Sequence, residues 1–192
     1  MTWKRTNATD QVHLLNHVEL YHRPGEGELA ARLFETMGCT VADVTSLFGS
    51  SSTYRCVYPG PDEGDPLNNA IYLSELRAPQ RLEELLSKRA EHDEELREAL
   101  ASSTVAVPGP GNAMHFGLRF STFDEVEAIF KRLQHDLPAE LEGRVTVQAP
   151  FAYPMSALDR EVIQGFIHTD VVGTGLFPFG QLIELQAHRP LA

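Results

Sequence analysis

The sequence is short of several features that would point to particular classes of protein. Its 192 residues include two cysteines, one tryptophan, and 16 lysines and arginines against 27 aspartates and glutamates. The formal charge of −11 argues against nucleic acid and anionic membranes as partners, because both attract basic protein surfaces. No apolar run approaches the roughly 20 residues that span a bilayer, and the polar start of the chain lacks the apolar core of a secretory signal. We therefore expect a cytoplasmic protein that binds neither nucleic acid nor membranes.

The cysteines, Cys39 and Cys56, each fall inside a run with the composition of a strand. A thiolate metal site needs more cysteines than this, and disulfides are rare in the cytosol. We predict two buried free thiols.

The first half of the chain has the pattern of one strand, one helix and three strands. From Val12 to Tyr21 the residues alternate, so that Val18 and Leu20 share one face and His17 and Glu19 share the other. A helix with an apolar stripe follows and ends before Gly38, where a C-terminal cap favours glycine. Three strand-like runs come next, over residues 39–45, 53–59 and 69–76.

A charged stretch over residues 79–101 then carries leucines at helical spacing, which predicts one solvated helix. The glycines and prolines of residues 108–111 predict a linker.

The second half repeats this order. Residues 113–121 alternate like the first strand, and the stretch from Thr122 to Glu125 fits a capping box at the start of a helix. Residues 144–148, 165–172 and 181–186 predict three more strands, and an apolar loop that includes residues 151–155 separates the first two.

These patterns predict an α+β fold of two βαβββ modules that form a cupped mixed sheet. The expected division is an N-terminal arm over residues 1–11, a first module over residues 12–107, which contains the charged helix 79–101, and a second module over residues 108–192.

Residues as well as element order match between the halves. The motif His17-Val18-Glu19-Leu20 corresponds to His115-Phe116-Gly117-Leu118, and Glu75-Leu76-Arg77-Ala78 corresponds to Glu184-Leu185-Gln186-Ala187. Each module thus offers one histidine on its first strand and one glutamate on its last. If the modules pack around a pseudo-twofold axis, the four side chains converge. Imidazole nitrogen with carboxylate oxygen suits a divalent metal such as Fe, Ni, Co, Mn or Zn.

On these residues the chain resembles the vicinal-oxygen-chelate superfamily. His17-Val18, His115-Phe116 and the closing motif from Phe179 to Leu185 match recurrent strand motifs of that family. The resemblance implies a glyoxalase-like fold around a metal. Members include glyoxalase I, extradiol dioxygenases, epimerases, fosfomycin-resistance enzymes and metal-free proteins of the bleomycin-resistance type that only sequester drugs, and fold alone does not choose among them.

The resemblance leaves two metal sets open. With His17, Glu75, His115 and Glu184 all ligating, it implies a glyoxalase I type of lyase or isomerase, in which Glu75 or Glu184 shuttles a proton. With Glu75 turned away, His17, His115 and Glu184 form the two-histidine, one-carboxylate set of an Fe(II) dioxygenase. His168 would then be an acid or base on a neighbouring strand.

Other residues carry weaker signals. The chain has the apolar run Leu176-Phe177-Pro178-Phe179-Gly180 where many family members have an Asp-Pro-x-Gly turn, and it shows no clear glutathione site. This apolar lip favours a larger or more aromatic small-molecule substrate. A metal-free binding protein is therefore the alternative from a different class. Glu19 and Arg119 would either bind a polar substrate group or form ion pairs. We interpret the remaining histidines as surface residues: His13, His22, His92, His135 and His188. The oligomeric state stays open, a homodimer included.

Overall fold

The computed structural model describes residues 17–48, 53–60, 69–76, 80–104, 115–174 and 180–191. The predicted N-terminal arm, the linker and most of the apolar lip lie outside these residues. In the first module the elements are β1 (His17–His22), α1 (Gly27–Thr36), β2 (Thr40–Asp43), α2 (Thr45–Phe48), β3 (Tyr54–Tyr58), β4 (Ala70–Glu75), α3 (Gln80–Ala90) and α4 (Glu94–Thr104). In the second they are β5 (His115–Arg119), α5 (Phe123–His135), η1 (Ala139–Leu141), β6 (Val145–Met155), η2 (Ser156–Leu158), β7 (Arg160–Thr169), β8 (Val172–Gly173) and β9 (Gln181–Pro190).

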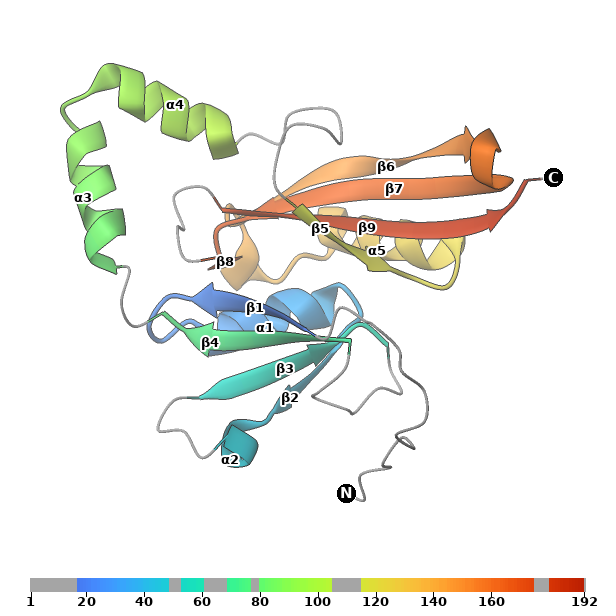
Figure 1. The fold of residues 1–192 in the computed structure, drawn as a ribbon, viewed down its shortest axis with the longest axis horizontal. Coiled ribbons are helices and arrows are strands. Elements are labelled where there is room, and N and C mark those ends of the chain that lie inside the picture. Colours follow the sequence, from blue (N-terminus) through green and yellow to red (C-terminus); the bar gives the residue numbers. More distant parts are fainter. Residues whose placement is uncertain are drawn as a thin grey trace.

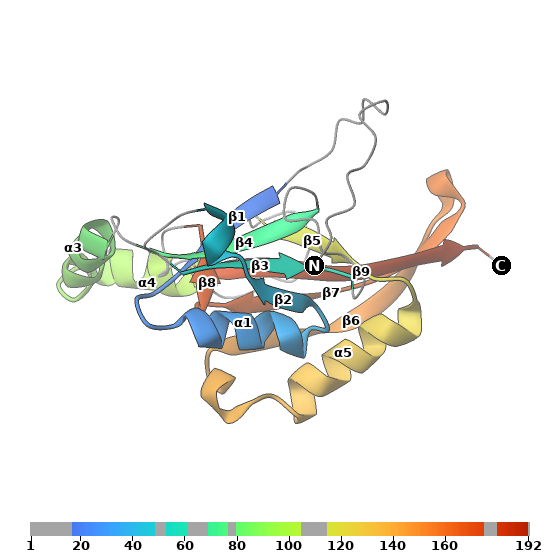
Figure 2. The same cartoon turned by 90° about the horizontal axis from the view of Figure 1, so that it is seen from below.

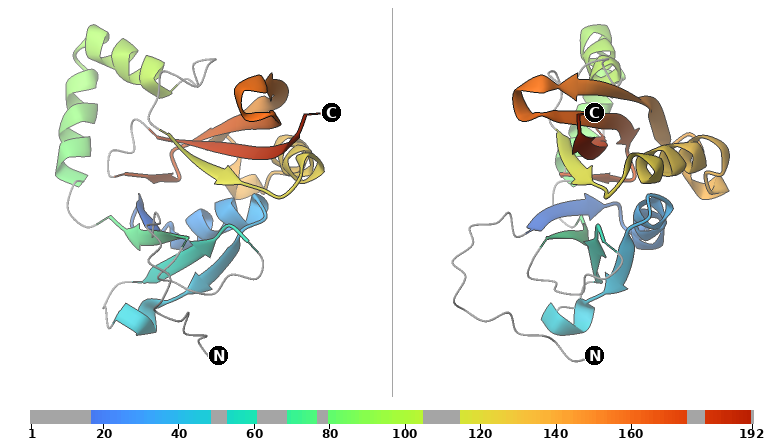
Figure 3. Two further views of the ribbon diagram at one scale, coloured as in Figure 1. Left: turned by 45° about the vertical axis from the view of Figure 1, so that its right-hand side comes forward. Right: turned by 90° about the vertical axis from the view of Figure 1, so that its right-hand side faces the viewer.

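The two modules build their sheets in the same way. The first sheet has the order β2-β3-β4-β1-β8 and the second has the order β5-β9-β7-β6. In each module the first strand pairs in parallel with the last, and the other pairings are antiparallel. This repeated order confirms the predicted α+β fold with two βαβββ modules and two mixed sheets, which Figure 3 shows one above the other.

The crossover helices α1 and α5 lie on the same side of the two sheets (Figure 2). The start of α5 is fixed by the predicted capping box, in which the Glu125 amide donates to Thr122 Oγ1 at 3.1 Å. The Glu125 carboxylate in turn accepts from the Ser121 amide at 3.0 Å. Because both helices cover the same side, each sheet keeps an opposite face without a crossover helix, which we call its open face.

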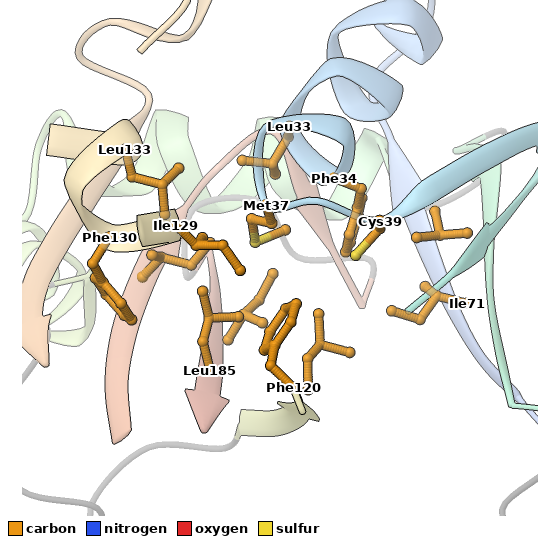
Figure 4. Packing of buried hydrophobic residues seen from close by; sticks show 14 of the residues in the cluster. Leu33, Phe34, Met37, Cys39, Ile71, Phe120, Ile129, Phe130, Leu133 and Leu185 are labelled. Atoms are coloured by element: carbon orange, nitrogen blue, oxygen red, sulfur yellow. The ribbon is translucent and has the colours of Figure 1, made fainter. Parts of the chain in front are cut away.

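One hydrophobic core spans both modules. Side chains of α1 and α5, including Phe34, Ile129 and Phe130, meet on the helix side of the sheets together with Met37, which directly follows α1. Phe120 and Leu185 complete the contact (Figure 4). Phe34 and Met37 are fully buried. Burial of this kind stabilises a fold by about 25 cal/mol per Å² of apolar area, so the shared core stabilises the two modules against each other.

Short polar and strand contacts also join the modules. Strand β8, from the second module, pairs antiparallel with β1 of the first. The Arg144 guanidinium bridges Glu26, which precedes α1, and Asp170 at the end of β7, with distances of 3.1 Å and 2.5 Å. These carboxylates raise the pKa of Arg144 above its ordinary value, Glu26 being the larger cause.

The charged stretch forms two helices and not the predicted single helix 79–101. The break between the two helices lies at Asp93. Its side chain accepts a hydrogen bond from the Leu96 amide at 3.0 Å and so caps the start of the second helix. Helices α3 and α4 project from the body of the protein (Figure 1). Leu82 and Leu85 on α3 are about half exposed, at 49% and 50%.

The region predicted as an apolar loop at residues 151–155 is also different, because it belongs to strand β6. Its prolines, Pro150 and Pro154, suggested a loop. Because β6 is the edge strand of its sheet, and its pairing with β7 shifts register between Gln148 and Phe151, prolines are tolerated there. Strands β7 and β9 are correspondingly longer than predicted and run past the end of β5 (Figure 1).

Both cysteines are buried and free, as predicted. Burial raises the pKa of the Cys39 thiol to about 12. His22, expected on the surface, is 3% exposed and its Nδ1 lies 2.9 Å from the Arg23 carbonyl. In the part of the chain that the structure describes, none of the helices is long and apolar enough to cross a membrane.

Candidate functional site

The register of the parallel strands decides which predicted site residues share a face. His17 pairs with Ala70, and Glu75 lies five residues further along β4, opposite His22. Paired residues in a sheet point to the same side and side chains alternate along each strand, so an odd offset places Glu75 on the face opposite to His17. Its carboxylate accepts a hydrogen bond from the Gly25 amide at 3.2 Å on that helix side.

This corrects the predicted equivalence of Glu75 with Glu184. In the second module His115 pairs with Leu182, and Glu184 follows two residues later on the same face. The residue at the corresponding place in the first module is Tyr72, two residues after Ala70. Glu75 therefore does not join His17 as a ligand or proton shuttle.

The His17 ring packs against Tyr72 instead. Their ring centroids lie 4.6 Å apart with an interplanar angle of 29°, a stacked arrangement. Tyr72 is 8% exposed, whereas His17 is exposed at the start of β1. The first module thus presents an aromatic pair on its open face where the second presents an ionisable one.

That ionisable pair is His115 and Glu184. His115 Nε2 lies 3.3 Å from Glu184 Oε2, and 23% and 11% of the two side chains are exposed. The His115 ring also meets Phe166 edge-on, with centroids 5.7 Å apart. Gly117 lies between His115 and Arg119 on this face, and its missing side chain leaves room for the Glu184 and Gln186 side chains. The pair is partly shielded from water, which strengthens its electrostatic interaction.

His168 lies on the same open face but away from the pair. It occupies the same row as His115, with Leu182 of β9 between them. Two strand spacings put the backbones about 10 Å apart. The His168 ring packs against Gly180 so closely that a Cβ at that glycine would collide with it. The structure therefore does not place His168 beside His115 and Glu184.

The predicted metal ligands are brought together only in part. Among the residues that the structure describes, which include all four, no group of three or more histidine, cysteine, aspartate or glutamate side chains is arranged to hold a metal ion. His115 and Glu184 converge, His17 stacks on Tyr72, and Glu75 is on the far face. In this arrangement the four side chains do not converge on one metal-binding site.

A cleft lies where the two sheets meet. It has a volume of about 80 Å³, roughly half that of a cavity that admits benzene. The cleft alone therefore holds only part of a small organic ligand, and the remainder would extend over a neighbouring surface. Its walls come from three strands and two loop residues: His17, Val18, Pro59, Asn69, Ala70, Ile71, Phe116, Gly117 and Leu118.

The open face of the second sheet carries further polar residues that sequence analysis missed. His188 Nε2 lies 2.7 Å from Gln186 Oε1, and the Tyr153 hydroxyl donates to Gln164 Oε1 at 3.0 Å. The alternation of residues 182–188 was the available signal, because it places Gln186 and His188 on the face of Glu184. His188, expected to be an ordinary surface residue, is half-buried there.

Comparisons with known proteins add a likeness of fold. No protein-family model matches the chain, and no curated protein matches its sequence. A glyoxalase/bleomycin resistance protein/dioxygenase from Alicyclobacillus acidocaldarius is 11% identical with a TM-score of 0.43, over 90% of this chain and 89% of that one. A structure described as a possible glyoxalase from Bacillus cereus is 14% identical with a TM-score of 0.37, over 88% and 95% of the two chains.

An integron cassette protein from the mobile metagenome of a Halifax Harbour sewage outfall is 11% identical with a TM-score of 0.41, over 91% and 99% of the two chains. Likenesses with TM-scores of 0.37 to 0.43 carry no argument about activity. The fold assignment rests on the strand order of this chain.

Proposed function

We propose that this protein is an enzyme with a glyoxalase-like fold that transfers a proton on a small organic substrate, the chemistry of a lyase or isomerase. The supporting observation is the 3.3 Å contact between His115 Nε2 and Glu184 Oε2 on the open face of the second sheet. An imidazole held by a carboxylate is a recurrent arrangement for general acid and base catalysis.

In this proposal His115 takes a proton from a carbon next to a carbonyl group and leaves an enolate. The imidazolium that forms is stabilised by the Glu184 carboxylate. It returns the proton to the same carbon or, when that carbon carries a hydroxyl group, to the former carbonyl carbon as the hydroxyl proton moves to the other oxygen. Positioned acid and base groups of this kind contribute about 10²- to 10⁴-fold to rates. Phe166 keeps the His115 ring in place from the side.

A metal-dependent enzyme is the second candidate, and one distance favours it. Two ligands about 2.1 Å from one divalent metal lie roughly 3.0 to 3.4 Å from each other, and the His115 and Glu184 atoms are 3.3 Å apart. His17, which lines the same cleft as Gly117, is the third donor to test. Such a site has three donors and not four, as expected for an Fe(II) extradiol-type dioxygenase rather than glyoxalase I.

The first experiment follows deuterium incorporation from D₂O by proton NMR into a panel of aryl-substituted 2-hydroxy ketones and 2-oxo acids. Wild type is compared with His115→Ala, Glu184→Gln and the matched control His92→Ala, a histidine in the turn between α3 and α4. We expect wild type and the His92→Ala control to incorporate deuterium, and both site variants to lose this activity.

The same proteins, purified without chelators, are measured for metal content and assayed before and after EDTA treatment. Exchange that survives EDTA supports the proton-transfer proposal. Exchange that needs Fe, Ni, Co, Mn or Zn, with metal lost in His17→Ala as well as His115→Ala, supports the second candidate. Ligand binding without exchange in any condition would make a metal-free sequestering protein the better explanation.

A further inference from the structure

The open face of the first sheet is rich in tyrosine. Every second residue of β1, β4 and β3 points to this face, and Glu19 pairs there with Tyr72, which in turn pairs with Cys56. Four of the five tyrosines of the chain lie on it: Tyr21, Tyr54, Tyr58 and Tyr72. Tyr58 and Tyr72 belong to a hydrophobic cluster that is separate from the main core. The first sheet therefore presents an aromatic surface on the side away from α1.

Three of these tyrosines surround Ser74 on β4. In the register of the sheet Ser74 lies between Tyr21 of β1 and Tyr54 of β3. Tyr72 precedes Ser74 by two residues on the same strand. Strand spacing puts the backbones of Tyr21 and Tyr54 about 10 Å apart, and the backbone of Tyr72 about 7 Å from that of Ser74. The small serine thus has an aromatic residue on three of its sides.

A carboxylate reaches into this group of tyrosines. Glu19 lies two residues before Tyr21 on β1 and directly opposite Tyr72 on β4. The Ser74 hydroxyl donates to Glu19 Oε1 at 2.8 Å, and Ser74 is 4% exposed. This hydrogen bond holds the half-buried Glu19 side chain over the serine.

Glu19 has no cationic partner in the part of the chain that the structure describes, since no lysine, arginine or histidine lies within salt-bridge distance of it. The nearest arginine along the chain, Arg23, pairs with Glu83 and Asp170 instead, at 3.3 Å in each case. One neutral hydroxyl offsets only part of the cost of shielding a charge from water. The net charge of −11 also attracts cations to the protein. Glu19 is therefore suited to pair with a cation from outside the chain.

The electrostatics of Tyr21 agree with this arrangement. Burial raises the pKa of the Tyr21 phenol above its ordinary value, and Glu19 and Tyr54 raise it further. The Tyr21 side chain therefore stays uncharged at neutral pH, and the negative charge of this group of residues comes from Glu19.

We infer that the open face of the first sheet binds a small organic cation with a methylated ammonium group, placed between Tyr21 and Tyr54 and neutralised by Glu19. A cation is attracted to the face of an aromatic ring when it lies within about 6 Å of the ring centre. A group midway between side chains on strands about 10 Å apart is about 5 Å from each of them. Aromatic rings with one carboxylate suit a methylated ammonium, whereas a primary ammonium needs more acceptors to replace its bound water.

The inference goes beyond the proposed function and does not rest on it. The residues that carry it belong to the first module, whereas His115 and Glu184 belong to the second. Its test measures binding without any reaction, so failure of either proposal leaves the other standing.

The test compares choline with its neutral isostere 3,3-dimethylbutan-1-ol, in which carbon replaces the ammonium nitrogen, and with ethanolamine, its primary-amine counterpart. Dissociation constants come from NMR titrations at one ionic strength. The proteins are wild type, Glu19→Gln, Tyr21→Phe, Tyr21→Leu and the matched control Glu75→Gln, whose carboxylate lies on the opposite face of the same sheet.

We expect choline to bind wild type at least tenfold more tightly than the neutral alcohol. Glu19→Gln should lose that margin, because the counter-ion is gone, whereas Glu75→Gln should match wild type. Tyr21→Phe keeps the ring and should bind choline nearly as well as wild type, and Tyr21→Leu should bind it more weakly.

Equal affinity of choline for wild type and Glu19→Gln would overturn the inference, as would equal binding of choline and the neutral alcohol or no binding of choline. Tighter binding of ethanolamine than of choline would overturn the assignment of a methylated ammonium. Equal losses in Tyr21→Phe and Tyr21→Leu would contradict a contact with the ring. Each variant is checked for an unchanged amide spectrum away from the substituted residue.

Discussion

Tyr72 occupies in the first module the position that Glu184 occupies in the second. Each residue lies on the last strand of its module, two residues after the partner of the first-strand histidine. One module therefore offers a stacked His17 and Tyr72, and the other offers His115 and Glu184 in close polar contact. Internal symmetry builds the two faces, and a difference at one position gives only the second histidine a carboxylate partner at this place.

The packing of α5 on its sheet predicts a large effect for Gly165→Ala. A Cβ at this glycine would lie 2.5 Å from Phe130 Cζ and 2.8 Å from Cε2, and Phe130 is 1% exposed. The ring has no room to move, so we expect a loss of about 1 to 3 kcal/mol of unfolding free energy, measured by urea denaturation.

Gly117→Ala is the matched control. The Cβ of an alanine at this position would meet the flexible end of the Gln186 side chain at 3.2 Å, which can move aside. The unfolding free energy should therefore change little. A Gly165→Ala protein as stable as wild type would contradict the packing described here.

The bridge formed by Arg144 predicts a stability cost for its removal. Arg144→Met leaves Glu26 and Asp170 without this cation, and the Arg144 side chain is 26% exposed. We expect about 1 to 3 kcal/mol of destabilisation. The stability of Arg144→Lys should lie between those of wild type and Arg144→Met, because an ammonium group keeps the positive charge but lacks the forked set of guanidinium donors. Chemical denaturation of the three proteins measures this, and a fully stable Arg144→Met would show that the bridge contributes nothing.

The pKa of His188 should rise when Arg119 is replaced by alanine. Burial and the positive charges of Arg119 and Arg160 hold this pKa below its ordinary value, so removing one charge favours the protonated ring. Titration of the imidazole signals by NMR gives the pKa directly. An unchanged or lower value in Arg119→Ala would contradict the placement of the two side chains.

The lowered pKa of His188 also makes the stability of the protein depend on pH. Because the folded pKa of His188 lies below the unfolded one, the unfolded chain takes up this proton first as the pH falls. The contribution of His188 to the unfolding free energy therefore falls from about pH 6.5 down through the folded pKa. His188→Gln should flatten this part of the pH profile.

The element order and the shared face of His115 and Arg119 could be predicted from the sequence. Alternation of period two placed His115 and Arg119 on one face, and the order of strands and helices repeated along the chain. The capping box at Thr122 fixed the start of α5. These features are local, so a single sequence is sufficient to find them.

The position of Glu75 could not be predicted, because it depends on the register between two parallel strands separated by more than 40 residues of chain. The sequence motif aligned Glu75 with Glu184, but the residue at the equivalent position is Tyr72, three residues earlier. An offset of three residues, an odd number, places Glu75 on the other face of the sheet. The extent of β6 was missed for a related reason. Pro150 and Pro154 are compatible with a strand at a sheet edge or a bulge, and both of these follow from the tertiary fold.

The most direct test of the central claim compares Glu184→Gln with Glu75→Gln in the deuterium exchange assay. Both changes remove one carboxylate and keep the shape of the side chain, but only Glu184 lies beside His115 on the open face. We predict that Glu184→Gln lowers the exchange rate at least 100-fold, whereas Glu75→Gln exchanges at the wild-type rate. Equal loss in both variants, or loss in Glu75→Gln alone, would contradict a site built on His115 and Glu184.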